Sequence, residues 1–248
     1  EAEGRAVRES ERILTCSRED ARRLQDLYKG DPDRFVVVPN GMAMGQVRRL
    51  DAEAKQALRR RLGMDAAPVV LFMGSAHGPN RDAALWLMEA AGRHGDLRFW
   101  IMGSVCEDRA VCEACSDNVT LLGVLHRGEK AVVLNAAHCA VNPVTYGSGT
   151  NLKMLEYAAY GLPIVTTPEG NRGLGFEPGR HVVEIDHVGL EQAMVATAWR
   201  AFHEDEAVHA MAAEAAALTA ACYDWPVLCR PLMDALACAA PRAPSPPS

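Results

Sequence analysis

Short apolar runs alternate with longer segments of mixed polarity through most of the chain after residue 67. The runs are apolar at successive positions rather than at every second one, which is typical of parallel strands covered on both faces. The strand candidates lie at residues 68–75, 97–103, 118–123, 139–144, 163–166 and 181–186. Helix-forming segments separate them, notably at 80–94, 107–116 and 127–137. This alternation predicts an α/β fold, a Rossmann-like parallel sheet with right-handed crossovers and helices on both faces.

The chain on either side of this region carries further elements. Apolar runs at 12–16 and 34–41 predict two short strands. Ser17 is placed to cap the helix between them, because Asp20 stands three residues on and acidic residues fill the first turn. Further helices are predicted at residues 1–9, 51–62, 188–202, 204–221 and 223–239, the last with a break near Pro226. The end of the chain is rich in Pro and Ser, which predicts a disordered tail or a linker.

Residues 139–176 hold the densest group of glycine loops. The Gly-Ser-Gly sequence at 147–149 lets the backbone bend tightly and come close to a ligand. A hydroxyl from Thr150 or from the serine of this loop can cap the helix that follows. A glycine loop that leads into a helix N-terminus presents free N–H groups and the positive end of the helix dipole, so it suits a phosphate.

The helix after this loop carries one cation and one carboxylate. Lys153 and Glu156 are three residues apart and therefore share one helix face. Together with the glycine loop, they suit a molecule that has both a phosphate and sugar hydroxyls. Ligands of doubly wound sheets bind at the carboxyl ends of the strands. Small residues stand at these ends, at Gly74-Ser75, Gly103-Ser104, Gly123-Val124, 143–149 and 166–170.

Composition narrows the class of partner. The 248 residues are 49% hydrophobic and 23% charged, as in a globular protein with a full core. The net charge of −6 argues against a nucleic-acid partner, since no basic stripe is available to neutralise phosphates. The arginines at 1–23 and 59–61 are interpreted as solvated helix faces. No apolar run reaches the roughly 18 residues of a membrane span.

The eight cysteines are scattered, which fits reduced thiols better than a disulfide framework. Cys112 and Cys115 have the spacing of half a zinc site. No second pair follows at the distance of a zinc ribbon, so an ordinary short helix is the favoured interpretation and no metal is expected.

Several segments together resemble a known enzyme family. The segment "GSGTNLKMLEYAAYGLPIVTTPEGNRGL" is the most specific of them, and "VVLFMGSAHGPNRDAALWLM", "VTLLGVL" and "TCSREDARRL" support it. They are similar to the C-terminal, donor-binding half of GT-B glycosyltransferases of group 1, family 4-like, over about residues 12–236. The resemblance implies a remnant of the N-terminal domain and hinge at 1–40, a nucleotide-sugar-binding domain at 41–240 and a disordered tail at 241–248. We therefore expect the chain to be a fragment that lacks most of the acceptor domain and is inactive alone.

The resemblance assigns roles to individual residues. It implies that Glu156 holds the ribose hydroxyls of the donor, a contact that suits a carboxylate because its two oxygens can accept from a vicinal diol. Lys153 is a candidate contact to phosphate or sugar. Val124 and Leu125 fall where apolar contact and backbone grip the base, with ordinary packing at the strand end as the open alternative. The diphosphate and sugar are expected to meet Gly74, Ser75, Gly147, Ser148, Gly149, Thr150 and Asn151.

The sequence departs from the family pattern at two places. Many members carry an acid eight residues before the ribose-binding glutamate, and Ser148 stands there in this chain. Many also carry an Arg and a Lys after the first strand of this domain, where this chain has only His77 and Arg81. These departures put the sugar and the mechanism in doubt more than nucleotide binding. Glu169 and Arg172, on the last loop of the motif, could either order that loop or touch the ligand.

The resemblance implies a transferase of hexosyltransferase type. It would move a sugar from a UDP-, GDP- or ADP-sugar to an acceptor hydroxyl, with retention and without a cofactor. No Asp-x-Asp dyad is seen that would hold a divalent ion against the diphosphate, so we expect a metal-independent reaction. Two alternatives stay open, a non-catalytic nucleotide-binding or scaffold module and a nucleotide-sugar 2-epimerase of the same fold.

The expected acceptor is a glycan, a lipid or a small molecule, bound through the missing N-terminal domain. The expected location is cytoplasmic, with peripheral contact at the inner membrane as an option for the full-length enzyme. A membrane-binding surface is not visible in this acidic sequence.

Overall fold

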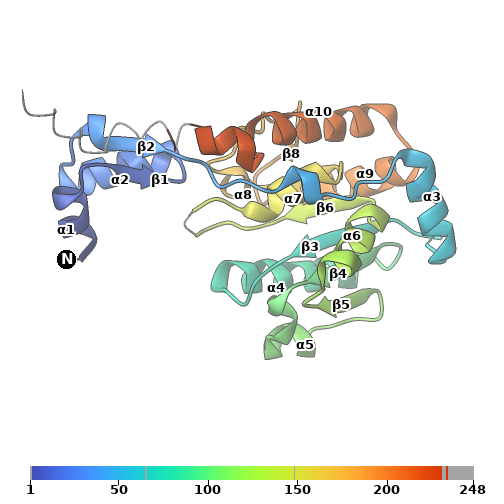
Figure 1. The fold of residues 1–248 in the computed structure, drawn as a ribbon. Helices are drawn as coiled ribbons and strands as arrows, with labels where there is room; N and C mark the ends of the chain where they lie inside the picture. Colours follow the sequence, from blue (N-terminus) through green and yellow to red (C-terminus); the bar gives the residue numbers. More distant parts are fainter. Residues whose placement is uncertain (1, 65, 148, 231–232, 234–248) are drawn as a thin grey trace, which may run out of the picture.

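A six-stranded parallel sheet forms the centre of the protein (Figure 1). The computed structural model describes residues 2–64, 66–147, 149–230 and 233 of the 248. The strand order is β5-β4-β3-β6-β7-β8, and each neighbouring pair runs parallel. The strands are β3 (Val69–Met73), β4 (Arg98–Met102), β5 (Val119–Gly123), β6 (Cys139–Asn142), β7 (Ile164–Thr166) and β8 (Val183–Glu184). The predicted α/β class and the predicted parallel sheet are both confirmed.

Helices cover both faces of this sheet. One face packs against α4 (Gly78–Arg93), α5 (Arg109–Glu113) and α9 (Leu190–Phe202). The other packs against α6 (Arg127–Ala136) and α7 (Leu152–Ala159), with α10 (Glu206–Cys222) lying along α7 and α3 (Ala52–Arg61) beside α6. The short helix α8 (Pro168–Asn171) follows β7. None of the helices within the described residues is long and apolar enough to cross a membrane.

The side chains of β3 show why the strands are apolar throughout. Val70 and Phe72 point into one core cluster, and Val69 and Leu71 point into the other. All four are at most 2% exposed. Because successive side chains of a strand point to opposite faces, a strand with helices on both sides needs apolar residues at every position.

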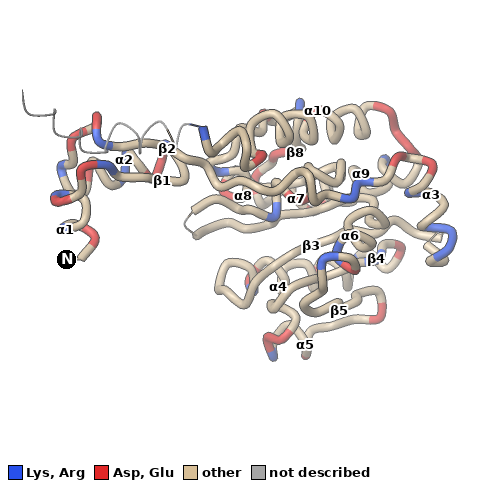
Figure 2. The backbone as a smooth tube through the Cα atoms, viewed as in Figure 1, with Lys and Arg blue, Asp and Glu red and all other residues tan. Residues whose placement is uncertain are grey.

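The first 40 residues form a small unit beside the main sheet (Figure 1). Its two strands pair in parallel, and Ser17 caps the second helix by accepting a hydrogen bond from the Asp20 N–H, as predicted. Acidic and basic residues are interleaved along its helices (Figure 2). The unit consists of α1 (Ala2–Glu9), β1 (Ile13–Thr15), α2 (Arg18–Tyr28), a 3-10 turn at Pro32–Arg34 and β2 (Phe35–Val37).

The cysteine-rich and C-terminal segments differ from prediction in extent. The helix predicted at 107–116 is shorter, because a 3-10 turn at Ser104–Glu107 precedes α5. After α10, a new helical segment begins at Trp225, next to Pro226, and runs to Arg230. Most of the predicted helix beyond that point, and the predicted tail at 241–248, lie outside the described residues.

Gly103 makes possible a close approach between the ends of β3 and β4. Its φ is +107°, and a Cβ there would lie 2.2 Å from the carbonyl oxygen of Gly74. Gly92, by contrast, lies in α4 and has no atom within 4 Å of its virtual Cβ. Of the two, only Gly103 must be glycine, because its backbone conformation disfavours a side chain and a Cβ would collide with Gly74.

We predict opposite effects for alanine at these two glycines. Gly103→Ala should destabilise the fold by roughly 1–3 kcal/mol or more, from backbone strain and the collision with Gly74. Gly92→Ala should stabilise it by about 0.5–1 kcal/mol, because it removes a helix glycine without a clash. Urea unfolding of both variants measures this, and a neutral Gly103→Ala would contradict the packing described for the strand ends.

Candidate functional site

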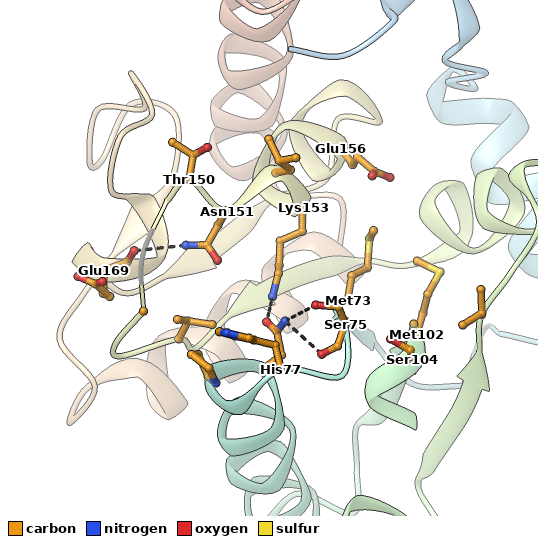
Figure 3. Close-up of a pocket in the computed structure, with 18 of the residues that line it drawn as sticks. Met73, Ser75, His77, Met102, Ser104, Thr150, Asn151, Lys153, Glu156 and Glu169 are labelled. Atoms are coloured by element: carbon orange, nitrogen blue, oxygen red, sulfur yellow. Dashed lines mark hydrogen bonds between the residues drawn. The ribbon is translucent and has the colours of Figure 1, made fainter. Parts of the chain in front are cut away.

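A pocket of about 540 Å³ opens at the carboxyl ends of the central strands (Figure 3). It lies where β3 and β6 are neighbours and the chain leaves them toward opposite faces of the sheet. This is the switch point at which doubly wound sheets bind ligands. The residues that follow β3, β4, β5 and β6 all contribute to its wall, so the predicted ligand edge of the sheet is hollow.

Most of the residues singled out from the sequence line this pocket. They are Gly74, Ser75, Val124, Leu125, Gly147, Thr150, Asn151, Lys153 and Glu156. Gly149 belongs to the same loop but does not line the wall. Ser148 lies outside the described residues.

The glycine loop has the tight bends that its sequence predicts. The φ angles of Gly147 and Gly149 are +140° and +76°, a region that residues with a side chain rarely adopt. Arg172 donates hydrogen bonds to both of their carbonyl oxygens, at 3.2 and 3.1 Å. Arg172 also forms an ion pair with Glu169. The acid–arginine pair thus orders the loop, and both residues also line the pocket.

The predicted helix cap is wrong for Thr150. The N-cap of α7 is Asn151, and its side chain makes no capping hydrogen bond. The Thr150 hydroxyl instead accepts a hydrogen bond of 2.9 Å from the Asn40 amide, in the segment that leads out of the first 40 residues. Because no side chain among the described residues caps α7, no described side chain accepts from the first N–H groups of this helix, which can face water or a ligand.

Lys153 holds its ammonium group at the end of β3 (Figure 3). Its Nζ donates to the Asn80 Oδ1 at 2.6 Å and lies 4.4 Å from the centre of the Phe72 ring. Burial lowers the pKa of this lysine to about 7. No described carboxylate lies within ion-pair distance of it. Lys153 is therefore a part-buried amine that has no counter-ion among the described residues and lies on the same pocket wall as the glycine loop.

Glu156 lies at the opposite end of the pocket from Glu169 (Figure 3). It forms an ion pair with Lys130 of α6, and the two side chains are 28% and 33% exposed. Lys130 was not predicted as a site residue. It stands in the first turns of the helix after β5, and the start of such a helix lies near the ligand edge of the sheet, which is the signal that could have found it.

Asn80 and Tyr146 were also missed. The Asn80 amide donates to the Ser75 carbonyl and hydroxyl oxygens at 3.3 and 3.1 Å, so it joins Lys153 to the loop after β3. Tyr146 donates to Asp82 at 2.6 Å and lines the wall beside the glycine loop. Asn80 lies in the segment "VVLFMGSAHGPNRDAALWLM" and Tyr146 directly precedes the Gly-Ser-Gly loop, but neither residue type by itself indicates a ligand.

The two basic residues that follow β3, His77 and Arg81, have different positions. His77 lines the pocket, but Arg81 does not and lies 3.7 Å from the Asp108 carboxylate.

The two apolar residues after β5 also differ. Val124 is 68% exposed on the wall, whereas Leu125 is partly buried and packs against the core. Of these two residues, Val124 is therefore the one that offers an exposed apolar surface to the pocket.

No group of three or more His, Cys, Asp or Glu side chains within the described part of the chain is arranged to hold a metal ion. Cys112 donates to the Cys106 carbonyl oxygen, and Cys115 lies near the Val119 carbonyl oxygen. One Asp-x-Asp sequence, at residues 31–33, caps a 3-10 turn in the N-terminal unit and does not line the pocket.

The sequence has curated relatives. It is 29% identical over 218 residues to a D-inositol 3-phosphate glycosyltransferase of Geodermatophilus obscurus, with 80% of this chain and 47% of the relative covered. It is 27% identical over 260 residues to the protein of that name from Xylanimonas cellulosilytica, with 98% and 60% covered. The chain therefore spans about half the length of the curated relatives that it matches.

The fold has solved counterparts. The crystal structure of Anabaena HepE in complex with UDP-glucose superimposes with a TM-score of 0.76 at 15% identity, covering 94% of this chain and 65% of that one. At this identity the likeness concerns the fold alone. A model of the family described as glycosyl transferases group 1 matches residues 67–198, which is just over half of the chain. The chain belongs to the group 1 glycosyl transferase family.

Proposed function

We propose that this chain is the donor-binding part of a glycosyltransferase that moves a sugar from a nucleotide diphosphate sugar to an acceptor hydroxyl. The observation that carries the proposal is the pocket at the switch point, which joins Lys153, Glu156 and a helix N-terminus that no described side chain caps. We further propose retention of the anomeric configuration, no requirement for a metal, and a glycan, lipid or small molecule as acceptor.

The diphosphate would lie against the glycine loop and the start of α7. The N–H groups there can donate to phosphate oxygens, and the positive end of the helix dipole favours the negative charge. Lys153 adds a cation within the same wall. As the bond to the sugar breaks, the leaving diphosphate gains negative charge, which these fixed donors stabilise without reorganisation.

The nucleoside would lie toward Glu156 and Val124. The Glu156 carboxylate can accept hydrogen bonds from the two ribose hydroxyls. Lys130, as its ion-pair partner, fixes the position of that carboxylate. The exposed Val124 offers an apolar surface to the base. The complex of the Anabaena counterpart with UDP-glucose supports uridine as the first nucleoside to test.

Removing the Glu156 charge should weaken nucleotide binding. We expect UDP, GDP or ADP to bind the chain, and Glu156→Gln to lower the affinity by roughly 10- to 100-fold, the value of losing hydrogen bonds to a charged acceptor. Isothermal titration calorimetry measures this. Glu89→Gln, at an exposed residue of α4 outside the pocket wall, serves as the matched control and should bind like the wild type. No binding of any of the three nucleotides to the folded chain would refute the proposal.

Donor binding should depend on pH through Lys153. Its pKa of about 7 means that it is largely neutral above pH 7 in the free protein, and a bound diphosphate would raise that pKa. Binding then takes up a proton, so the affinity for UDP-glucose should fall as pH rises from 7 to 8.5, by up to about tenfold per unit. Below about pH 7, where Lys153 is already protonated in the free protein, the affinity for UDP-glucose should not change with pH.

Calorimetry in buffers of different ionisation enthalpy counts the proton directly. Lys153→Met keeps the length of the side chain but cannot take up a proton, so its UDP-glucose affinity should be lower and independent of pH over this range. An identical pH profile for wild type and Lys153→Met would show that the lysine does not face the diphosphate.

Metal removal provides a separate test of the mechanism. We expect the full-length enzyme to keep its transferase activity in EDTA, because Lys153 and the helix N-terminus would supply the positive charge at the diphosphate. Product formation is measured before and after chelation, with added Mg²⁺ or Mn²⁺ as the comparison. Loss of activity in EDTA that either ion restores would contradict metal independence.

A further inference from the structure

A second cavity of about 480 Å³ lies at the amino ends of the strands, at the opposite edge of the sheet from the donor pocket. Its walls come from the segment before α3, from α3 itself, from the residues just before β6 and β7, and from Glu204 and His209. Blue segments mark basic residues on the chain leading into α3 and at the end of α3 (Figure 2). None of its lining residues takes part in the proposed transferase chemistry.

The segment before α3 is held rigidly against α6. The buried Asn135 amide donates to the Arg48 carbonyl oxygen at 2.8 Å and accepts from the Leu50 N–H at 2.9 Å. Arg49 lies between these two anchored residues. Its guanidinium group rests against Gly161, where a Cβ would come within 2.5 Å of it. Gly161, with a φ of +65°, thus leaves the space that this arginine occupies.

Three cations line the cavity from this one segment. Lys55 and Arg59 are four residues apart on α3 and share a face, and Arg49 precedes them. Lys55 donates one hydrogen bond, of 2.7 Å, to the Tyr160 carbonyl at the end of α7. Arg59 donates to the carbonyls of Ala136 and Ala137 at the end of α6. Lys55 therefore keeps two N–H donors for a ligand, and Arg49 has no hydrogen-bond partner among the described residues.

The two acidic residues that line the cavity already have partners. The Asp51 carboxylate caps α3 by accepting from the Ala54 N–H. Glu204 lies 3.4 Å from Arg59 and 3.2 Å from the His209 ring. No ion pair within the described residues involves Arg49 or Lys55. Burial, with repulsion from Arg49 and Arg59, lowers the pKa of Lys55 to about 8. The cation cluster is thus only partly compensated.

We propose that this cavity is an anion site that binds the phosphate group of a phosphate monoester. A dianion would face the free donors of Arg49 and Lys55 together, and such charge-assisted hydrogen bonds are the strong kind. An arginine fork with a lysine beside it matches the shape and charge of phosphate. His138, whose Nδ1 accepts from the Val69 N–H, lines the cavity without adding charge at neutral pH, because burial lowers its pKa to about 3.

The test is a titration with inorganic phosphate at pH 7.5 and constant ionic strength, followed by amide NMR. We expect shift changes at Leu50 and Gly161 in the wild type. Arg49→Gln should weaken this binding by roughly 10- to 100-fold, because it removes a charged donor. Arg48→Gln is the matched control, since Arg48 is the adjacent exposed arginine and does not line the cavity. Lys55→Gln provides a second variant that should lose the same signal.

Lys153→Met separates this site from the donor pocket. Phosphate shifts that survive Lys153→Met but vanish in Arg49→Gln support the proposal. Shifts confined to Gly147 and Gly149 that vanish in Lys153→Met, or equal binding by Arg49→Gln and Arg48→Gln, overturn it. The result does not depend on whether the donor pocket binds a nucleotide.

A second arm identifies the source of the phosphate. Glucose 6-phosphate tests a free monoester, and vesicles of phosphatidic acid in phosphatidylcholine test a lipid headgroup. Binding that depends on Arg49 in either arm supports the site and assigns its source. Lys55, one of the two proposed ligand-binding residues, is part-buried, which favours the free monoester, because a free monoester can enter more deeply than a headgroup held in a bilayer.

Discussion

The path of the chain at two neighbouring strands sets the rest of the structure. β3 and β6 lie side by side in the sheet, but α4 leaves β3 toward one face and α7 leaves β6 toward the other. No helix can then cover the carboxyl ends of both strands, so a pocket remains there. The same divergence brings the N-terminus of α7 to the pocket and directs its side chains into the wall.

α7 joins two environments of opposite character. At its N-terminus, the free N–H groups and Lys153 make the pocket attractive to an anion. At its C-terminus, the last carbonyl groups of the helix carry partial negative charge, and Lys55 donates to that of Tyr160. Arg59 does the same at the end of α6. Lys55 and Arg59 therefore satisfy carbonyl groups at the ends of two helices. The donors that remain free in this basic segment face the second cavity.

The two part-buried charged residues of the first pocket have different surroundings. The Lys153 ammonium group lies over Phe72 and has one amide oxygen as its hydrogen-bond partner. These contacts stabilise the charged form less than burial destabilises it, so the pKa of Lys153 is lowered. Glu156 has the opposite arrangement, because Lys130 supplies a direct counter-charge. The Lys153 end of the pocket thus favours a negatively charged ligand group. The Glu156 end presents a carboxylate that its ion pair with Lys130 holds in position. A diphosphate joined to a ribose has this polarity.

The sequence by itself determined the class of the fold, the ligand edge of the sheet and most residues of the pocket wall. Apolar runs, glycine bends and helix periodicity are local properties, so each can be recognised within ten or fifteen residues. Only the tertiary structure decided which groups meet across the pocket. Lys130 forms an ion pair with Glu156, and Lys153 donates a hydrogen bond to Asn80. Asn40 donates to the Thr150 hydroxyl, which the sequence predicts as a helix cap. These pairs depend on strand order and on loop paths, because they join residues that are 26 to 110 positions apart and no local pattern encodes them.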